Sequence, residues 1–214
     1  MTHAVIAAPL RLEWAAVRRA RTTVVCTGMG PRRSIRSARR LGDAAAVLVA
    51  GVAGGLAPAV AVGDLVVASE VRAPDGTVRA CVGGADLADR LRAAGLRVHY
   101  GPVLSWPRLV GGGQRRRLAA TGALAVDMES AWLAPPEPVP FAVVRAVSDT
   151  VAAPLVRPGV VGAGLAALRA LRRAVPALDA WADAATTASD VRKDALLTVP
   201  AQEGVLPDAE TEVS

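Results

Sequence analysis

Short apolar runs alternate along the chain with longer segments in which apolar residues recur every three or four positions. The runs predict strands at 3–8, 22–26, 45–50, 64–71, 97–104 and 140–147. The longer segments predict helices near 10–20, 31–42, 85–95, 112–120, 127–134 and 159–175. Because the strands contain almost no polar position, helices should cover both faces of their sheet. We therefore expect an α/β fold, a three-layer α/β/α domain around a central, mostly parallel, twisted sheet.

The helical period is lost after residue 185. Residues 186–214 are polar and acidic, with two basic and six acidic side chains. We expect residues 1–185 to form one folded domain and residues 186–214 to be a disordered tail. A chain of 214 residues with 52% hydrophobic residues is sufficient for one domain with a sizeable core.

The sequence favours a cytoplasmic protein without a metal. The first residues have no basic leader, and Arg11 and Glu13 interrupt their short apolar run, so we expect no signal peptide. Residues 44–63 are uncharged, but glycines and Pro58 lie within them, as in a buried strand that runs into a loop. The two cysteines and two histidines are isolated and do not form a zinc motif.

The net charge of +6 is unevenly distributed, because the acidic tail leaves ten positive charges in excess on residues 1–185. A basic surface can attract nucleic acid, an anionic membrane or a phosphorylated substrate. The arginine pairs at 18–19, 32–33 and 39–40 lie on predicted helices without interleaved aromatic residues, which is typical of solvated helix faces. We expect no nucleic-acid partner.

Three turns follow the ends of predicted parallel strands, where ligands bind in sheets of this kind. CTGMGPRRS (26–34) places two glycines before a helix N-terminus, GVAGG (51–55) brings three glycines together, and SDT (148–150) places an acid at a strand end. Each also has a purely structural explanation: a tight turn, a sharp connection or a helix cap. Glu13, Glu129 and Arg145 lie on elements that can converge on the edge where Asp149 emerges.

Four motifs together resemble one family. They are CTGMG (26–30), VAGVAGGLAPAVAVGDLVVASEV (49–71), AVDMESAW (125–132) and FAVVRAVSD (141–149). Their order and intervals resemble the nucleoside phosphorylase and nucleosidase superfamily over residues 4–175, in particular the methylthioadenosine/S-adenosylhomocysteine nucleosidases. The resemblance implies an enzyme that cleaves the N-glycosidic bond of a purine nucleoside without a cofactor.

The resemblance assigns catalytic roles to Asp149 and Glu13. Asp149 would protonate N7 of the departing adenine, with Ser148 beside it, and Glu13 would position the attacking water. The residues expected near that water are Thr27, Gly28 and Arg145. Adenine is a poor leaving group until it is protonated, so the reaction needs a general acid. A carboxyl group supplies that proton at neutral pH where burial raises its pKa.

The resemblance also assigns residues to the sugar and the base. Glu129 would accept hydrogen bonds from the ribose hydroxyls, with Met128 packed against the sugar. A carboxylate there favours the positive charge that develops on the sugar. Leu109, Val110 and Trp106 would line the purine pocket.

Three features depart from the usual nucleosidase pattern. Asp127 replaces the more usual Glu, and we expect it to cap a short helix and to have no catalytic role. Residues 70–104 are compact, which implies a more open pocket and a larger 5′ substituent. This region and the Arg-rich helix LRALRRAVPALDAW (168–181) resemble the hopanoid-associated branch, whose members convert adenosylhopane to ribosylhopane.

Our expected substrate is therefore adenosylhopane, a lipid-linked nucleoside. The helix with Arg169 and its neighbours could make a peripheral contact with a membrane. The alternative is that its apolar side faces the core and its basic side is solvated.

Several alternatives stay open. The substrate could be methylthioadenosine, S-adenosylhomocysteine or futalosine. Inorganic phosphate could replace water, because Arg32 and Arg33 lie beside a glycine turn, which would make the enzyme a nucleoside phosphorylase. We favour water because Glu13 matches the water-activating acid. A non-catalytic nucleoside-binding protein is the alternative from another class. The resemblance further implies a homodimer or a larger homo-oligomer.

Overall fold

The computed structural model describes residues 3–151 and 160–197. Its strands are β1 (Ala4–Ala8), β2 (Thr23–Cys26), β3 (Ala46–Gly55), β4 (Leu65–Arg72), β5 (Val78–Ala80), β6 (Val98–Ser105), β7 (Ala125–Asp127) and β8 (Phe141–Asp149). Its helices are α1 (Arg11–Val17), α2 (Pro31–Arg40), α3 (Gly84–Ala93), α4 (Gly112–Ala119), α5 (Ser130–Leu133) and α6 (Val160–Leu197). The predicted α/β class is confirmed.

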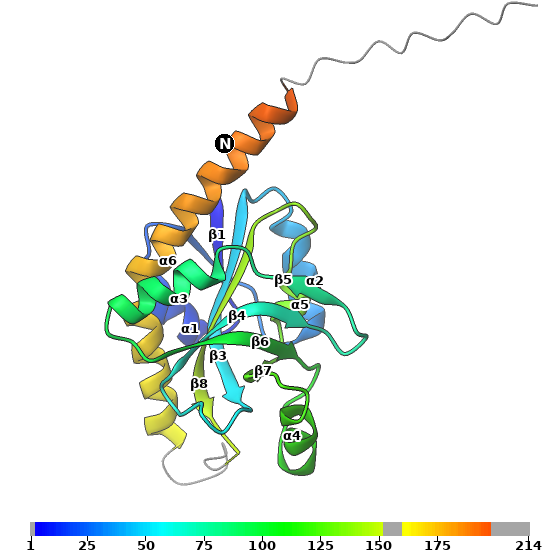
Figure 1. The fold of residues 1–214 in the computed structure, drawn as a ribbon, viewed down its shortest axis with the longest axis vertical. Helices are drawn as coiled ribbons and strands as arrows, with labels where there is room; N and C mark the ends of the chain where they lie inside the picture. Colours follow the sequence, from blue (N-terminus) through cyan, green and yellow to red (C-terminus); the bar gives the residue numbers. More distant parts are fainter. Residues whose placement is uncertain (1–2, 152–159, 198–214) are drawn as a thin grey trace, which may run out of the picture.

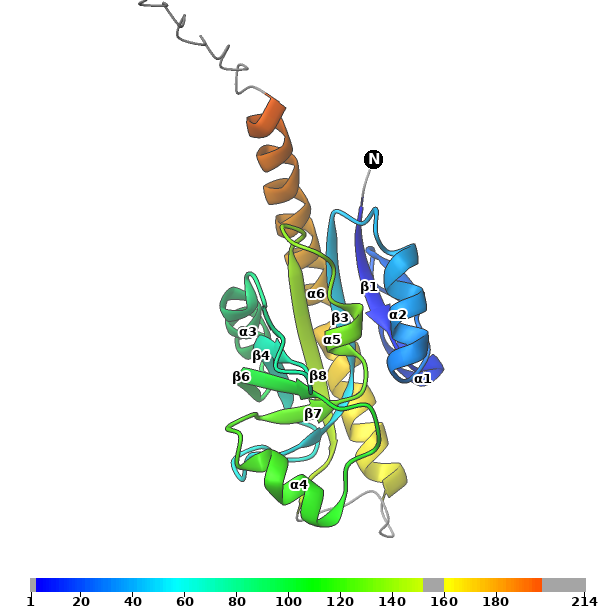
Figure 2. The same ribbon diagram turned by 90° about the vertical axis from the view of Figure 1, so that its right-hand side faces the viewer.

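The strands form a single mixed sheet. β1 pairs in parallel with β2 and β3, and β3 pairs in parallel with β8. The end of β3 pairs instead with β7, and β7 is linked through β6 and β4 back to β8. Strands β3, β8, β4, β6 and β7 therefore close into a ring, which β1, β2 and β5 extend (Figures 1 and 2). Five of the eight pairings are parallel, in agreement with the mostly parallel sheet predicted.

The six predicted strands are all present, and the structure adds two short ones. β5 pairs antiparallel with β4, and β7 occupies the first residues of AVDMESAW, where we had predicted the start of a helix. The helix α5 accordingly begins at Ser130 and not at 127. β3 continues through the glycines to Gly55, where the sequence had indicated a turn after residue 50. Strands of three residues are too short to show a periodic pattern.

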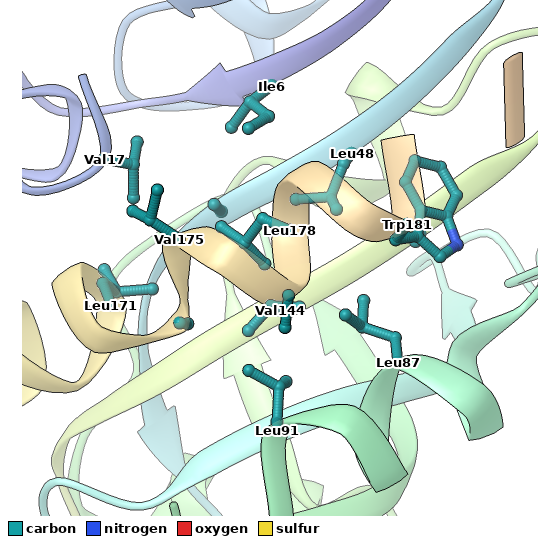
Figure 3. Packing of buried hydrophobic residues seen from close by; sticks show 14 of the residues in the cluster. Ile6, Val17, Leu48, Leu87, Leu91, Val144, Leu171, Val175, Leu178 and Trp181 are labelled. Atoms are coloured by element: carbon teal, nitrogen blue, oxygen red, sulfur yellow. The ribbon is translucent and has the colours of Figure 1, made fainter. Parts of the chain in front are cut away.

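Helices pack on both faces of the sheet, as predicted. Strand neighbours alternate between the two layers: Val144 faces α1, α3 and α6, whereas Val143 faces the side of α2 and α5. Figure 3 shows Leu171, Val175 and Leu178 of α6 packed over the sheet. A smaller cluster joins the end of β3 and β7 to α4. Burial on both faces explains why the strands read as continuous apolar runs.

The last helix is much longer than predicted. We expected it to end near 175 and a disordered tail to begin at 186, but α6 continues to Leu197. Up to Ala185 the added part of the helix buries Leu178, Trp181 and Ala182 against the core. Beyond it, alanine, leucine, arginine and lysine favour helix by propensity. The remaining tail residues, 198–214, lie outside the described residues.

The basic residues of α6 do not lie beside an apolar face that is free to contact a membrane. Leu171 is fully buried, Leu168 packs partly against the core, and Leu165 is the exposed member of the three. The apolar side of the helix therefore faces the sheet, which is the alternative to membrane contact that the sequence left open. Within residues 3–151 and 160–197, no helix combines the length and the apolar character that crossing a membrane requires.

The contact of α6 with the sheet should contribute strongly to stability. Leu178 is fully buried between α6 and the strands, so Leu178→Ala removes packed surface and leaves a cavity. We expect the free energy of unfolding, measured by urea denaturation, to fall by about 2–5 kcal/mol. Leu165→Ala, on the exposed side of the same helix, is the control and should cost less than about 1 kcal/mol. Equal losses in the two variants would contradict this packing.

Candidate active site

The predicted acids meet at one cavity. A cavity of about 320 Å³ lies at the carboxyl ends of β3 and β8, between α1, β7 and the start of α6. Its volume is within the range that small-molecule sites occupy. The predicted residues that line it are Glu13, Leu109, Met128, Glu129, Ser148 and Asp149. Larger hollows of about 420, 530 and 560 Å³ lie elsewhere on the described surface, but they contain none of the predicted site residues.

Arg145 lies behind this cavity and is completely buried in β8. Its Nη2 atom is 2.8 Å from Asp127 Oδ2 and 3.5 Å from Glu129 Oε2, and it donates a hydrogen bond to Ser130 Oγ at 3.0 Å. A buried guanidinium is tolerated only when acceptors surround it. The nearby carboxylates supply that environment and raise the pKa of Arg145 against the opposing effect of its burial.

Asp127 links the arginine to the backbone. Its Oδ1 atom accepts hydrogen bonds from the N–H groups of Glu129 and Ser130, at 3.2 and 3.3 Å, and from Ser105 Oγ at 2.6 Å. The N-cap residue of α5 is Glu129 and not Asp127 as predicted, although Asp127 accepts the N–H of Ser130, the first residue of the helix. The other oxygen of Asp127 pairs with Arg145, which the sequence did not predict.

Glu13 points from α1 into the end of β3. Its two oxygens accept the N–H groups of Val52, at 2.7 Å, and Leu10, at 2.6 Å. Burial raises the pKa of Glu13, and Arg145 and these two N–H groups offset only part of the effect. Gly51 permits the arrangement, because a Cβ atom there would overlap both Glu13 and Arg145.

Glu129 also lines the cavity. Its Oε1 atom accepts a hydrogen bond from the N–H of Gly30 at 3.1 Å, so the glycine turn before α2 is fixed to the AVDMESAW motif. Burial raises the pKa of Glu129 to about 7; Arg145 lowers it, and the neighbouring charge of Asp127 raises it further. Near neutral pH, therefore, this carboxyl group can accept hydrogen bonds or hold a proton.

Asp149 lines the cavity where β8 ends beside Gly54 of β3. Its Oδ1 atom accepts a hydrogen bond from Ser148 Oγ at 3.0 Å. Its Oδ2 atom forms an ion pair with Arg115 of α4, and both side chains are buried. Sequence reasoning did not find Arg115. The available signal was that Arg115 shares a helix face with Leu118, three residues later, which is also buried.

The remaining predicted residues take different places. Val110 lines a smaller adjoining cavity of about 40 Å³, together with Arg115 and Asp149. Trp106 packs partly buried in the cluster beside α4 and lines neither cavity. Thr27 and Gly28 also lie outside the lining, although Met29, the next residue, belongs to it.

The turn around Thr27 is tightly built. Thr27 is buried, and its Oγ1 atom has no hydrogen-bond partner among the described residues. Gly28 has a φ of +85°, and the aliphatic part of Arg33 packs directly over it. Among the described residues, no group of three His, Cys, Asp or Glu side chains is arranged to hold a metal ion.

Comparison with known proteins agrees with this architecture. The family model described as "Phosphorylase superfamily" matches residues 15–175. A search of curated proteins found no match. The 5′-methylthioadenosine/S-adenosylhomocysteine nucleosidase of Helicobacter pylori has a similar structure, with a TM-score of 0.70 and 18% identity over 86% of this chain and 98% of that one.

Two further solved structures are similar to a comparable degree. The 5′-methylthioadenosine/S-adenosylhomocysteine nucleosidase of Neisseria meningitidis has a TM-score of 0.67 and 20% identity, over 84% of this chain and 100% of its own. The futalosine hydrolase of Helicobacter pylori has a TM-score of 0.68 and 17% identity, over 87% and 97%. At these identities the likeness shows a common fold.

The raised pKa of Glu129 makes stability depend on pH. Glu129 ionises near pH 4.5 in the unfolded chain but near 7 in the folded one, so ionisation destabilises the fold as the pH rises between these values. Glu129→Gln removes this effect and keeps an acceptor for Gly30. We compare the free energy of unfolding of Glu129→Gln with that of the wild type. Between pH 4 and pH 8, we expect the variant to gain roughly 3 kcal/mol of stability relative to the wild type.

Urea denaturation at a series of pH values measures this difference. Glu70→Gln, at a half-exposed position outside the cavity, is the control and should show a much smaller change. A difference between Glu129→Gln and wild type that stays constant with pH would contradict the raised pKa.

Proposed function

We propose that this chain, which belongs to the phosphorylase superfamily, cleaves the N-glycosidic bond of a 5′-substituted adenosine and releases adenine. The observation that carries the proposal is that Glu13, Glu129 and Asp149 line one cavity with Met128. These three acids come from α1, β8 and the loop before α5, and all three are buried at the wall of this one cavity. They match the charges that develop when a glycosidic bond breaks.

In the proposed reaction, water attacks the anomeric carbon of the ribose and passes a proton to Glu13. The electron pair of the C–N bond leaves with the adenine, and Asp149 donates a proton to its N7 atom. Glu129 binds the ribose hydroxyls beside Met128 and favours the positive charge on the sugar. Ser148 orients Asp149 through its hydrogen bond to Oδ1. A positioned general acid typically contributes roughly 10²–10⁴-fold in rate.

The charges around Glu13 and Glu129, where the ribose is proposed to bind, support water in preference to phosphate as the attacking group. Glu13, Asp127 and Glu129 surround one arginine, Arg145, so a phosphate dianion would meet an excess of carboxylates. The N–H of Gly30, at the start of α2, already donates to Glu129. Arg33, which the sequence suggested for phosphate, packs over Gly28.

The rim of the cavity supports a large, apolar 5′ substituent. Leu12 and Met29 line the cavity and yet are 68% and 51% exposed. Exposed apolar side chains grouped at a cavity indicate an apolar ligand that extends beyond it. We infer adenosylhopane as the substrate, converted to ribosylhopane; methylthioadenosine, S-adenosylhomocysteine and futalosine are the alternatives.

A substrate panel tests this proposal. The protein is incubated with adenosylhopane, methylthioadenosine, S-adenosylhomocysteine and futalosine, with and without phosphate, and free base is followed by chromatography. We expect adenine from adenosylhopane, at a kcat/KM above that for the other three and independent of phosphate. A non-catalytic nucleoside-binding protein would bind members of the panel without turnover. Absence of free base from every nucleoside would refute the enzymatic proposal.

The role of Asp149 is tested by Asp149→Asn, which cannot donate the proton. We expect kcat to fall by about 10²–10⁴-fold, with a smaller change in KM. Asp86→Asn, at an exposed position on α3, is the matched control and should retain wild-type activity. Circular dichroism checks that both variants are folded. Full activity in Asp149→Asn would show that another group protonates the base.

A further inference from the structure

The ion pair between Arg115 and Asp149 is not explained by the proposed reaction. Arg115 donates from Nη1 to Asp149 Oδ2 and from Nη2 to the backbone oxygen of Asp149 at 3.0 Å. Its Nε and Nη2 atoms also donate to the carbonyl oxygen of Gly55, at 3.2 and 3.1 Å. Both partners are 4% exposed, so the guanidinium lies inside the protein at the end of the cavity.

The ion pair with Arg115 and the proposed role of Asp149 as an acid both require the same atom, Oδ2 of Asp149. The general acid must carry a proton before it can pass one to the base. Oδ2 accepts the hydrogen bond from Arg115, whereas Ser148 Oγ lies 3.0 Å from Oδ1 and 3.3 Å from the carbonyl oxygen of Ala53 and has one proton to share between them. A guanidinium does not release its own proton under these conditions. The Oδ2 atom can therefore bind a proton, or present it to a base, once Arg115 has left.

Arg115 also occupies the space next to the acid. Its guanidinium lies across Gly54, where a Cβ atom would overlap Nη2. The adjoining cavity, lined by Val110, Arg115 and Asp149, measures about 40 Å³. That is room for a few water molecules at most. The 320 Å³ cavity also reaches Asp149, but a base that pairs with its Oδ2 atom needs the volume that Arg115 fills.

The position of α4, the helix that carries Arg115, and the glycines at its two ends are compatible with movement of this helix. α4 lies at the edge of the molecule, apart from the helices that cover the two faces of the sheet (Figures 1 and 2). It buries Arg115 and Leu118, its other side chains being wholly or partly exposed. Gly111 is the N-cap of α4, Gly112 is its first residue, and Gly122 lies three residues beyond its last; Gly112 and Gly122 have φ of +51° and +77°. Glycine adopts a wider range of backbone dihedral angles than other residues, as hinges often require.

We propose that Arg115 is a positioning residue that competes with the purine for Asp149. Arg115 neutralises the buried carboxylate and fills the space beside its Oδ2 atom, and the incoming base displaces it by an outward movement of α4. Displacement frees Oδ2 of Asp149 for the proton that goes to N7. This inference rests on the proposed function, because it takes Asp149 as the acid at the base end. It adds a coupling between base binding and α4.

Adenine, the product base, is the probe. Arg115→Ala removes the competitor, so we expect adenine to bind roughly tenfold more tightly than to wild type in titration calorimetry. KM for the nucleoside should fall, whereas kcat should change less. Arg115→Lys keeps a cation near Asp149 and should restore the weaker binding of the wild type. Arg117→Ala, an exposed position on the same helix, is the matched control and should match the wild type.

A second measurement does not depend on how the variants fold. Hydrogen exchange of residues 112–119 in the wild-type protein should become faster when adenine is added, because the displaced helix loses the contacts of Arg115. Unchanged or slower exchange would overturn the proposal, and so would equal or weaker adenine binding by a folded Arg115→Ala. Tighter adenine binding by this variant in a protein that releases no base would support the competition while refuting the proposed function.

Discussion

The buried guanidinium of Arg145 is the constraint on which the site depends. A positive charge in the middle of an apolar strand is destabilising unless acceptors surround it. Asp127, Glu129 and Ser130 provide these acceptors, and all three belong to the short segment around β7 and α5. The arginine therefore fixes the position of AVDMESAW relative to β8, and with it the place of Glu129 in the cavity.

The same arginine determines what the neighbouring strand can contain. β3 runs beside β8, with Gly51 paired to Arg145. Any side chain at Gly51 would enter the space of the guanidinium and of Glu13. The absence of a side chain there lets Glu13 reach the backbone of β3 from α1, on the other side of the cavity. Three segments distant in sequence are thus tied to one charge, and each contributes an acid or a wall to the site.

Sequence reasoning was successful where a residue type was out of place in its pattern. Glu129 stood out as an acid in an apolar run, and Arg145 was expected on an element that converges on the same edge; the structure places their side chains 3.5 Å apart. Arg115 was missed because it begins a run of three arginines on a helix, and such a run normally indicates a solvated face. β7 was missed because three residues form a strand here only through their pairing with the ends of β3 and β6. Such pairing is tertiary and leaves no local signal.

The two ends of the cavity differ in their electrostatics, and the difference suits the direction of the proposed reaction. Where the sugar is proposed to bind, carboxylates outnumber the single guanidinium of Arg145, which would favour the positive charge that develops on the ribose. At the base end, one carboxylate faces one guanidinium, Asp149 with Arg115. Negative charge develops on the base as the bond breaks, and an ionised, unpaired Asp149 would oppose it. Before a base binds, the guanidinium of Arg115 balances the negative charge of Asp149. When Arg115 leaves, a proton on Asp149 must take over that balance. The exchange of Arg115 for a proton would keep the base end electrically neutral throughout, so that the acid is generated only when a base is present to receive its proton.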